Sequence, residues 1–261
     1  MGFTKTEAIV LRTKELREAD SLITLYTRDW GKVQVVAKGL RKVKARYGAS
    51  LEIFTHNQVM LFSKTDKDLA RLTGCQVMHP FYSLRESYFK YGMASYLLEL
   101  VDKLSEYREA NQDIFNLLGK SFSLMDAGVL KTRENYLSLW NWFALKILDY
   151  SGYKVSLESC IYCKQKPALG RPVVFSLPDG GISCRACLKN ADYVFELNPE
   201  VWTKLRLLQK SALPQLMDIE LAAETKLAIK ILLEKYLQFI SGHSFNCQEF
   251  FFASAQNKTA S

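Results

Sequence analysis

The first 80 residues alternate between apolar and polar positions with a period of two, which is typical of β-strands that bury one face. The segment 28–31 interrupts this alternation with turn chemistry, because Asp29 can bond its own backbone and Gly31 accepts a positive φ. Five short strands in this stretch predict a small closed barrel or a sandwich. The strands are expected at 6–16, 21–27, 32–38, 51–63 and 70–77, the fourth with a break near residue 55.

From Pro80 onward the apolar period changes to that of an α-helix. Asn198 before Pro199 fits the start of a helix, and Gly152 fits the end of another. The first helical face is marked by Phe89, Met93, Tyr96, Leu97, Leu100 and Leu104. Further helices are expected at 114–125, 130–150, 199–209 and 218–241, and the stretch 157–195 is expected to be irregular.

The two patterns together predict an α+β protein, with a five-stranded barrel followed by a helical domain. We expect the barrel domain at 1–80, the helical domain at 81–253 with an insertion at 157–195, and a flexible polar tail at 254–261. Apolar residues make up 48% and charged residues 24% of the 261 residues, so a hydrophobic core can support this fold without disulfide bonds.

The cysteines of the insertion form two pairs that predict a metal site. Cys160 and Cys163 enclose two residues, Cys184 and Cys187 enclose two more, and twenty residues separate the pairs. Two such turns bring four sulfurs to one tetrahedral ion, and Zn²⁺ accepts this geometry without strain. We expect one structural Zn²⁺ ion, because a closed Cys₄ shell leaves no position for substrate.

Two other interpretations of these cysteines are less favoured. Disulfide bonds are disfavoured in the cytoplasm, where we expect this chain. Redox CxxC pairs normally begin a helix in a βαβ unit, and no such pattern surrounds these pairs. Cys75 and Cys247 are isolated and are interpreted as small buried side chains.

The cytoplasmic expectation rests on two absences in the sequence. No run of 18 or more apolar residues is present to form a membrane-spanning helix. The N-terminal residues lack the apolar core and cleavage site of a signal peptide.

Positive charge is concentrated in the predicted barrel. Residues 1–80 contain 14 Lys and Arg against 8 Asp and Glu, a net charge of +6, whereas the remaining residues contain 21 against 19. Such asymmetry indicates a polyanionic partner, usually nucleic acid and sometimes a membrane surface. Most charge runs are solvated surface loops, but a basic run on a small barrel favours nucleic-acid binding.

The basic run follows the third predicted strand, and a second basic set ends the first strand. Clustered cations repel one another, and a phosphate backbone relieves that repulsion by releasing counterions. Tyr47 adds a ring on which a base can stack. The predicted nucleic-acid contacts are Lys38, Arg41, Lys42, Lys44, Arg46 and Tyr47 in the run, and Arg12, Lys14 and Arg17 in the second set.

Catalytic motifs do not emerge from the sequence. The three histidines, His56, His79 and His243, are separated and fit neither HxE nor HExxH spacing. No P-loop and no dinucleotide-binding glycine pattern is present. We therefore expect a binding protein that is not an enzyme.

Seven stretches stand in a recognisable order along the chain. They are 7–12 (EAIVLR), 17–27 (READSLITLYT), 31–32 (GK), 37–41 (AKGLR), 81–82 (FY), 97–100 (LLEL) and 148–153 (LDYSGY), the last followed by the four cysteines. In this order they resemble the RecO family of bacterial DNA repair and recombination mediators, and the resemblance covers nearly the whole chain. Many members keep the cysteines and some lack them.

The resemblance implies an OB-fold barrel followed by an all-helical domain with a zinc-ribbon-like insertion. It implies binding of single- and double-stranded DNA, annealing of complementary strands, and no catalysis. It further implies action with RecR on DNA coated by single-strand binding protein, indirectly helping to load RecA at the bacterial nucleoid during repair. The basic run matches the family's DNA-binding region.

Two rival functions belong to other classes. One is an RNA-binding zinc protein, whose barrel would prefer structured RNA. The other is a zinc-ribbon nucleic-acid enzyme, which would show metal-dependent turnover and a carboxylate cluster.

Overall fold

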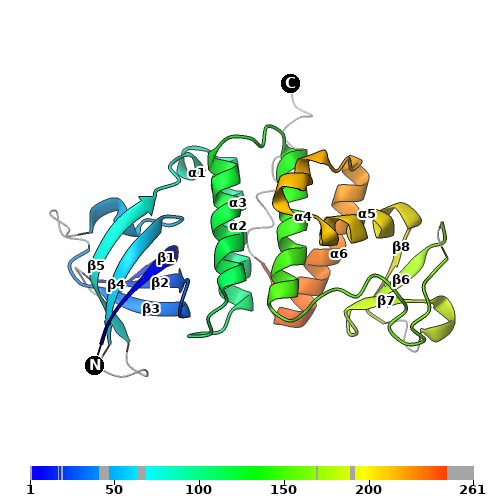
Figure 1. Ribbon diagram of the computed structural model, residues 1–261, viewed down its shortest axis with the longest axis horizontal. Coiled ribbons are helices and arrows are strands. Elements are labelled where there is room, and N and C mark those ends of the chain that lie inside the picture. The colour runs from blue at the N-terminus through cyan, green and yellow to red at the C-terminus, as the bar shows by residue number, and fades with distance from the viewer. Residues whose placement is uncertain are drawn as a thin grey trace. The chain divides into compact units, whose positions relative to one another are not determined.

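The computed structural model describes residues 2–16, 18, 20–40, 47–63, 69–168, 170–188 and 192–245 (Figure 1). These residues form two compact units, the first ending at Val129 and the second spanning Leu130–Phe245. Within these ranges, none of the helices combines the length and the apolar character that a bilayer crossing requires.

A closed five-stranded barrel begins the first unit, which confirms the predicted barrel. Its strands pair in the order β1-β2-β3-β5-β4, and β4 closes the barrel on β1. All these pairs are antiparallel except β3 with β5. This topology is that of an OB-fold. The strands are β1 (Gly2–Glu15), β2 (Ser21–Thr27), β3 (Gly31–Ala37), β4 (His56–Ser63) and β5 (Ala70–His79), with the short 3₁₀ helix η1 (Gly48–Leu51) between β3 and β4.

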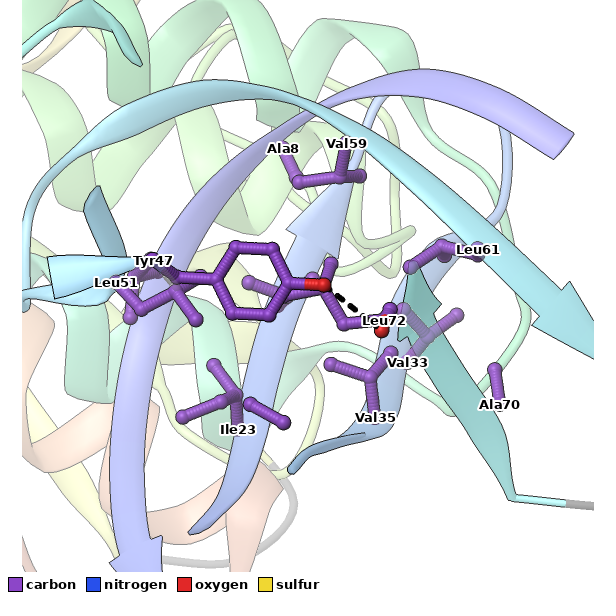
Figure 2. Close-up of a cluster of buried hydrophobic side chains, with 13 residues drawn as sticks. Ala8, Ile23, Val33, Val35, Tyr47, Leu51, Val59, Leu61, Ala70 and Leu72 are labelled. Carbon is purple, nitrogen blue, oxygen red and sulfur yellow. Dashed lines mark hydrogen bonds between the residues drawn. The ribbon is translucent and has the colours of Figure 1, made fainter. Parts of the chain in front are cut away.

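The barrel interior is filled by alternate residues of every strand (Figure 2). On β3, for example, Val33, Val35 and Ala37 are buried in the interior, while the intervening residues face outward. This alternation follows from the period of two in a pleated strand. The part of this core that the strands supply therefore follows from the alternating pattern visible in the sequence.

Three helices share the compact unit of the barrel: α1 (Ser83–Glu86), α2 (Tyr88–Leu104) and α3 (Gln112–Asp126). Side-chain caps fix the starts of the two long helices, because Ser87 accepts from the amide of Lys90 and Asn111 accepts from that of Ile114. The expected domain boundary after residue 80 stays a prediction.

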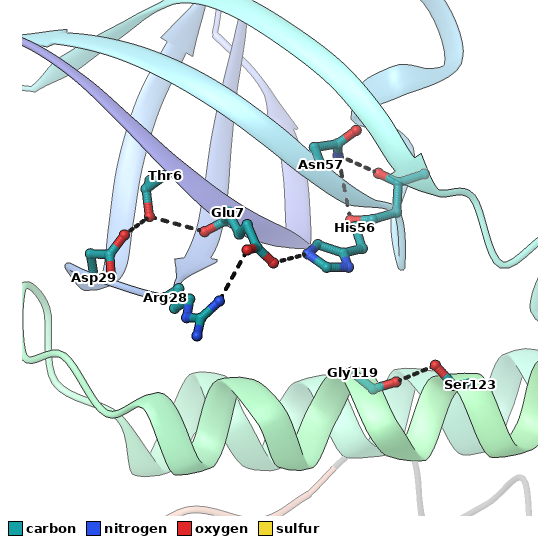
Figure 3. Close-up of polar contacts among 9 residues, drawn as sticks. Thr6, Glu7, Arg28, Asp29, His56, Asn57, Gly119 and Ser123 are labelled. Atoms are coloured by element: carbon teal, nitrogen blue, oxygen red, sulfur yellow. Dashed lines mark hydrogen bonds and ion pairs between the residues drawn. The ribbon is translucent and has the colours of Figure 1, made fainter.

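A chain of polar contacts lies on the outer side of the barrel, near α3 (Figure 3). Glu7 accepts from Arg28 at 3.1 Å and contacts the Nε2 atom of His56 at 3.0 Å. The His56 ring also packs edge-on against Phe115 of α3, with 5.5 Å between ring centres. The glutamate thereby holds an imidazole that packs against α3.

The second unit combines helices with a small sheet. Its helices are α4 (Arg133–Tyr150), α5 (Pro199–Lys210) and α6 (Ala223–Ser241), with the 3₁₀ helix η3 (Leu213–Asp218) between the last two. The fully buried Trp140 and Trp202 anchor its core. Lys230 is also buried and pairs with Glu234 at 2.8 Å, its ammonium lying 5.5 Å from the centre of the Trp140 ring. The pairing offsets the desolvation of that charge.

The sequence predicted that the stretch 157–195 is irregular, and this prediction is wrong. The stretch contains a three-stranded antiparallel sheet in the order β7-β6-β8, together with a 3₁₀ turn. These elements are β6 (Val173–Ser176), β7 (Gly181–Ser183), η2 (Arg185–Cys187) and β8 (Val194–Leu197). Every residue of β6 and β7 is buried, so these strands lack the alternation by which the barrel strands were recognised.

Candidate metal centre and nucleic-acid interface

The first cysteine pair is attached to strand β7 by backbone hydrogen bonds. The amide of Ile182 donates to Ser156, and the amide of Ile161 donates to Ile182, both at 2.9 Å. The second pair begins directly after β7, at Cys184. A single short strand therefore fixes the positions of both pairs.

Each pair closes into a tight turn. In the first, the amide of Lys164 donates to the carbonyl of Cys160 at 2.9 Å, and Lys164 adopts a left-handed φ of 62°. In the second, the amide of Cys187 donates to the carbonyl of Cys184 at 3.0 Å. Turns of this kind direct both sulfurs of a pair to the same side.

The four sulfur atoms meet at one place, as the spacing predicted. All of them lie within 4.8 Å of one another, and Cys163 and Cys184 are 3.9 Å apart. All four are free thiols, and this separation is far longer than a disulfide bond of about 2.05 Å. A tetrahedral ion with sulfur ligands at about 2.3 Å places them roughly 3.8 Å apart. The cluster therefore fits a single metal ion.

Cys160 is the most buried of the four cysteines, with 1% of its surface exposed. Burial raises the pKa of its thiol, but amide groups of Cys184, Cys163 and Tyr162 point at the sulfur and lower the pKa to about 6. The amide of Cys184 lies 3.5 Å from that sulfur. The protein thus stabilises the thiolate form that a metal requires.

The first two lysines of the predicted nucleic-acid surface lie close together on the barrel. Lys14 of β1 stands opposite Leu22 of β2, and Leu22 stands opposite Val36 of β3, two residues before Lys38. Both lysines are exposed, and neither has an ion-pair partner among the described residues. The strand pairing therefore unites charges that are 24 residues apart in the sequence.

A hydrogen bond joins the start of the basic run, after β3, to the connection between β1 and β2. The amide of Gly39 donates to the carboxylate of Asp20 at 2.9 Å, and Gly39 has a φ of 69° that favours glycine. The remaining predicted cations, Arg17, Arg41, Lys42, Lys44 and Arg46, lie outside the described residues.

Arg12 differs from the two lysines because it has a partner inside the same unit. Its Nε atom lies 3.7 Å from the carboxylate of Asp102 and donates to the Thr24 hydroxyl at 3.2 Å. Asp102 is also 3.4 Å from the ammonium of Lys32, which is nearly buried. The Arg12 side chain is still 55% exposed, so its role at the interface stays a prediction.

Tyr47 requires a correction, since its ring does not lie on the surface. It is 7% exposed and belongs to the barrel core, where its hydroxyl donates to the carbonyl of Leu72 at 3.3 Å (Figure 2). A ring enclosed in this way offers no face to a nucleobase. The predicted stacking role of Tyr47 is therefore wrong.

The sequence reasoning missed Arg71 as a member of the basic surface. Arg71 is exposed on β5 and stands opposite Val36 of β3, the strand that leads to Lys38. The sequence does not indicate that Arg71 lies at this surface, because the parallel pairing joins residues that are 35 positions apart. A lone arginine within a strand carries no motif.

The chain matches two family models, described as "Recombination protein O N terminal" over residues 1–81 and "Recombination protein O C terminal" over residues 85–246. It is similar to a DNA repair protein RecO of Halalkalibacterium halodurans, 29% identical over 95% of this chain and 94% of the relative. A protein of the same name from Syntrophus aciditrophicus is 35% identical, over 70% and 69%. The Bacillus subtilis protein of that name is 29% identical, over 92% and 90%.

Proposed function

The chain belongs to the RecO family, and from this membership we propose that it is a DNA repair and recombination mediator. It binds single- and double-stranded DNA and anneals complementary strands. The observation that best supports this proposal is the barrel surface on which strand pairing brings Lys14 and Lys38 together. Both lysines are exposed and have no ion-pair partner among the described residues.

Electrostatics accounts for the annealing step. Two DNA strands repel each other through their phosphates, and this repulsion slows their encounter. A basic barrel that neutralises part of both backbones lowers the repulsion and lets the bases pair. The sequence adds Arg17, Arg41, Lys42, Lys44 and Arg46 to the same loops, which strengthens this surface.

The step needs only binding, and we propose that the protein is not an enzyme. Base pairing itself supplies the driving force for annealing, so no nucleotide hydrolysis is required. The exposed lysines provide charge without base specificity, since contacts to phosphates carry no sequence information directly. Such a surface acts on any pair of complementary strands.

The partners follow from membership in the family. We propose that the protein acts with RecR on DNA coated by single-strand binding protein, in the bacterial cytoplasm at the nucleoid. Helping to load RecA is its indirect outcome. The contacting surfaces for these proteins are not assigned to residues.

We further propose that the four cysteines hold one Zn²⁺ ion with a structural role. All four ligand positions of a tetrahedral site are filled by protein sulfur, so no position is open for water or substrate. The ion would tie the turn after Leu157 to the end of β7 and so stabilise the small sheet.

A salt titration of DNA binding tests the proposal. Replacing Lys14 and Lys38 by glutamate should weaken binding of single- and double-stranded DNA and reduce the slope of log affinity against log salt by about one for each lost contact. The matched control replaces Lys120 and Lys131, two exposed lysines elsewhere in the chain, by glutamate, so that both double variants have the same net charge. Equal affinities and slopes for both double variants would contradict the proposal.

A further inference from the structure

Six residues stand opposite one another in an unbroken row around the barrel. Lys14 pairs with Leu22, Leu22 with Val36, and Val36 with Arg71. Arg71 in turn pairs with Phe62 of β4, and Phe62 pairs with Phe3 of β1. Residues paired in this way point to the same face of a sheet. Because this sheet is closed, the row runs round the barrel and returns to β1 at Phe3, so Phe3, Phe62 and Arg71 lie at one end of the row and Lys14 lies at the other.

The side chains of the row face the outside of the barrel. Neighbours of the row on β3, β4 and β5, namely Val35, Leu61 and Leu72, are buried in the barrel core. Because side chains alternate along a strand, the members of the row point away from that core. Lys14, Arg71 and Phe3 are exposed, and the other members are partly exposed.

The row ends in a pair of aromatic rings at the surface. The rings of Phe3 and Phe62 have centres 5.0 Å apart and planes inclined by 47°. Phe3 keeps 68% of its surface exposed. A ring left in water forgoes the stabilisation that burial gives, and such a ring beside cations is suited to stack on a nucleobase.

Cations flank these rings and mark the chemistry of the partner. Arg71 lies on the strand next to Phe62, at a typical interstrand spacing of about 4.8 Å. Lys5, two residues after Phe3, is exposed on the same face because the two positions are in phase. None of Lys5, Lys14 and Arg71 has an acidic partner within the described part of the chain.

We propose that the end of this row formed by Phe3, Phe62 and Arg71 is a stacking surface for unpaired bases, with single-stranded DNA as its occupant. Phe3 and Phe62 receive a base, while Arg71 and Lys5 contact the flanking phosphates. Rings can stack only on bases that are unpaired and splayed, so the row favours single strands over duplex. This inference rests on the proposed DNA binding and assigns to it a site for unpaired bases.

The test compares binding of an oligothymidylate with an abasic oligonucleotide of the same length and charge. Phe3→Ala should weaken binding to the oligothymidylate about tenfold and leave the abasic strand and duplex DNA unaffected. Phe3→Trp should retain the affinity for the oligothymidylate, since it keeps a stacking ring. Arg71→Ala should weaken binding to both single strands. Tyr88→Ala is the matched control, because Tyr88 is an aromatic residue with 77% exposure on α2.

Each contrary result has a separate meaning. Equal oligothymidylate affinities for Phe3→Ala and the unaltered protein, with normal DNA binding, would overturn the stacking surface and leave the proposed function intact. An equal loss on the base-bearing and abasic strands would also overturn stacking. A concentration-dependent dimer that Phe3→Ala abolishes would show that a second copy of the chain covers the rings. Absence of any DNA binding by the unaltered protein would overturn both proposals.

Discussion

The Sγ atoms of Cys163 and Cys184 lie 3.9 Å apart, although twenty residues separate them in the chain. The contact joins the two cysteine turns at the end of β7. With the other two sulfurs it forms a cluster whose dimensions match a tetrahedral metal site.

Loss of this cluster should cost the second unit its metal and part of its stability. The double replacement Cys160→Ser and Cys184→Ser removes two of four ligands, so the purified protein should contain no zinc and melt at a lower temperature. Metal analysis and thermal unfolding measure the two effects. Cys75→Ser is the control, because Cys75 packs in the barrel unit and should leave the metal content at one ion per chain.

Gly31 should tolerate no side chain. It has a φ of 62°, and a Cβ placed there would overlap the carbonyl oxygen of Glu109. Gly31→Ala should therefore lower the free energy of unfolding by about 3 kcal/mol or more. Gly128→Ala is a matched control, since Gly128 has a φ of 66° but open space around it, and it should cost only about 1–2 kcal/mol. Urea denaturation distinguishes the two, and similar losses would contradict the assigned overlap.

Asp102 should be important for holding the barrel against α2. It is the ion-pair partner of Lys32, whose side chain is only 9% exposed, and its loss leaves that ammonium without a counter-charge. Asp102→Asn should lower the free energy of unfolding by about 1–3 kcal/mol. Glu106→Gln removes an exposed carboxylate from the same region and should change it by less than about 0.5 kcal/mol. Chemical denaturation of both variants provides the measurement.

His56 should make the stability of the barrel unit depend on pH. Burial lowers its pKa, an effect that the contact with Glu7 opposes and the neighbouring His79 reinforces. The unfolded chain therefore takes up a proton more readily, so stability is full above the ordinary histidine pKa of about 6.5 and falls as the pH drops through the lower folded value.

Denaturation at a series of pH values between about 7.5 and 5 tests this dependence. His56→Gln should flatten the loss of stability in this range. The control is His243→Gln, at an exposed position, and it should keep the full loss of stability at low pH. A steeper loss of stability with falling pH in His56→Gln would contradict the lowered pKa of His56.

The barrel was predictable because each strand buries one face in a single core. Val33, Val35 and Ala37 repeat every second position, and the core cluster contains all three. The cysteine site was predictable for a related reason, because ligand spacing within a tight turn is a local property of the sequence.

Other features depend on contacts that the sequence does not show. The strand β6 was missed because all four of its residues are buried, which removes the alternating pattern. Tyr47 looked like part of a basic surface, yet its ring enters the barrel core and bonds Leu72. Arg71 joined that surface only through the pairing of β3 with β5, which connects distant segments.

The most direct test of the account is fluorescence-monitored annealing of complementary DNA strands, with and without the protein and without ATP. The basic barrel surface predicts faster annealing, and the acceleration should fade as salt rises because phosphate neutralisation drives it. Absence of acceleration, together with tight binding of structured RNA or cleavage of the strands, would contradict the account and favour an RNA-binding protein or a nucleic-acid enzyme.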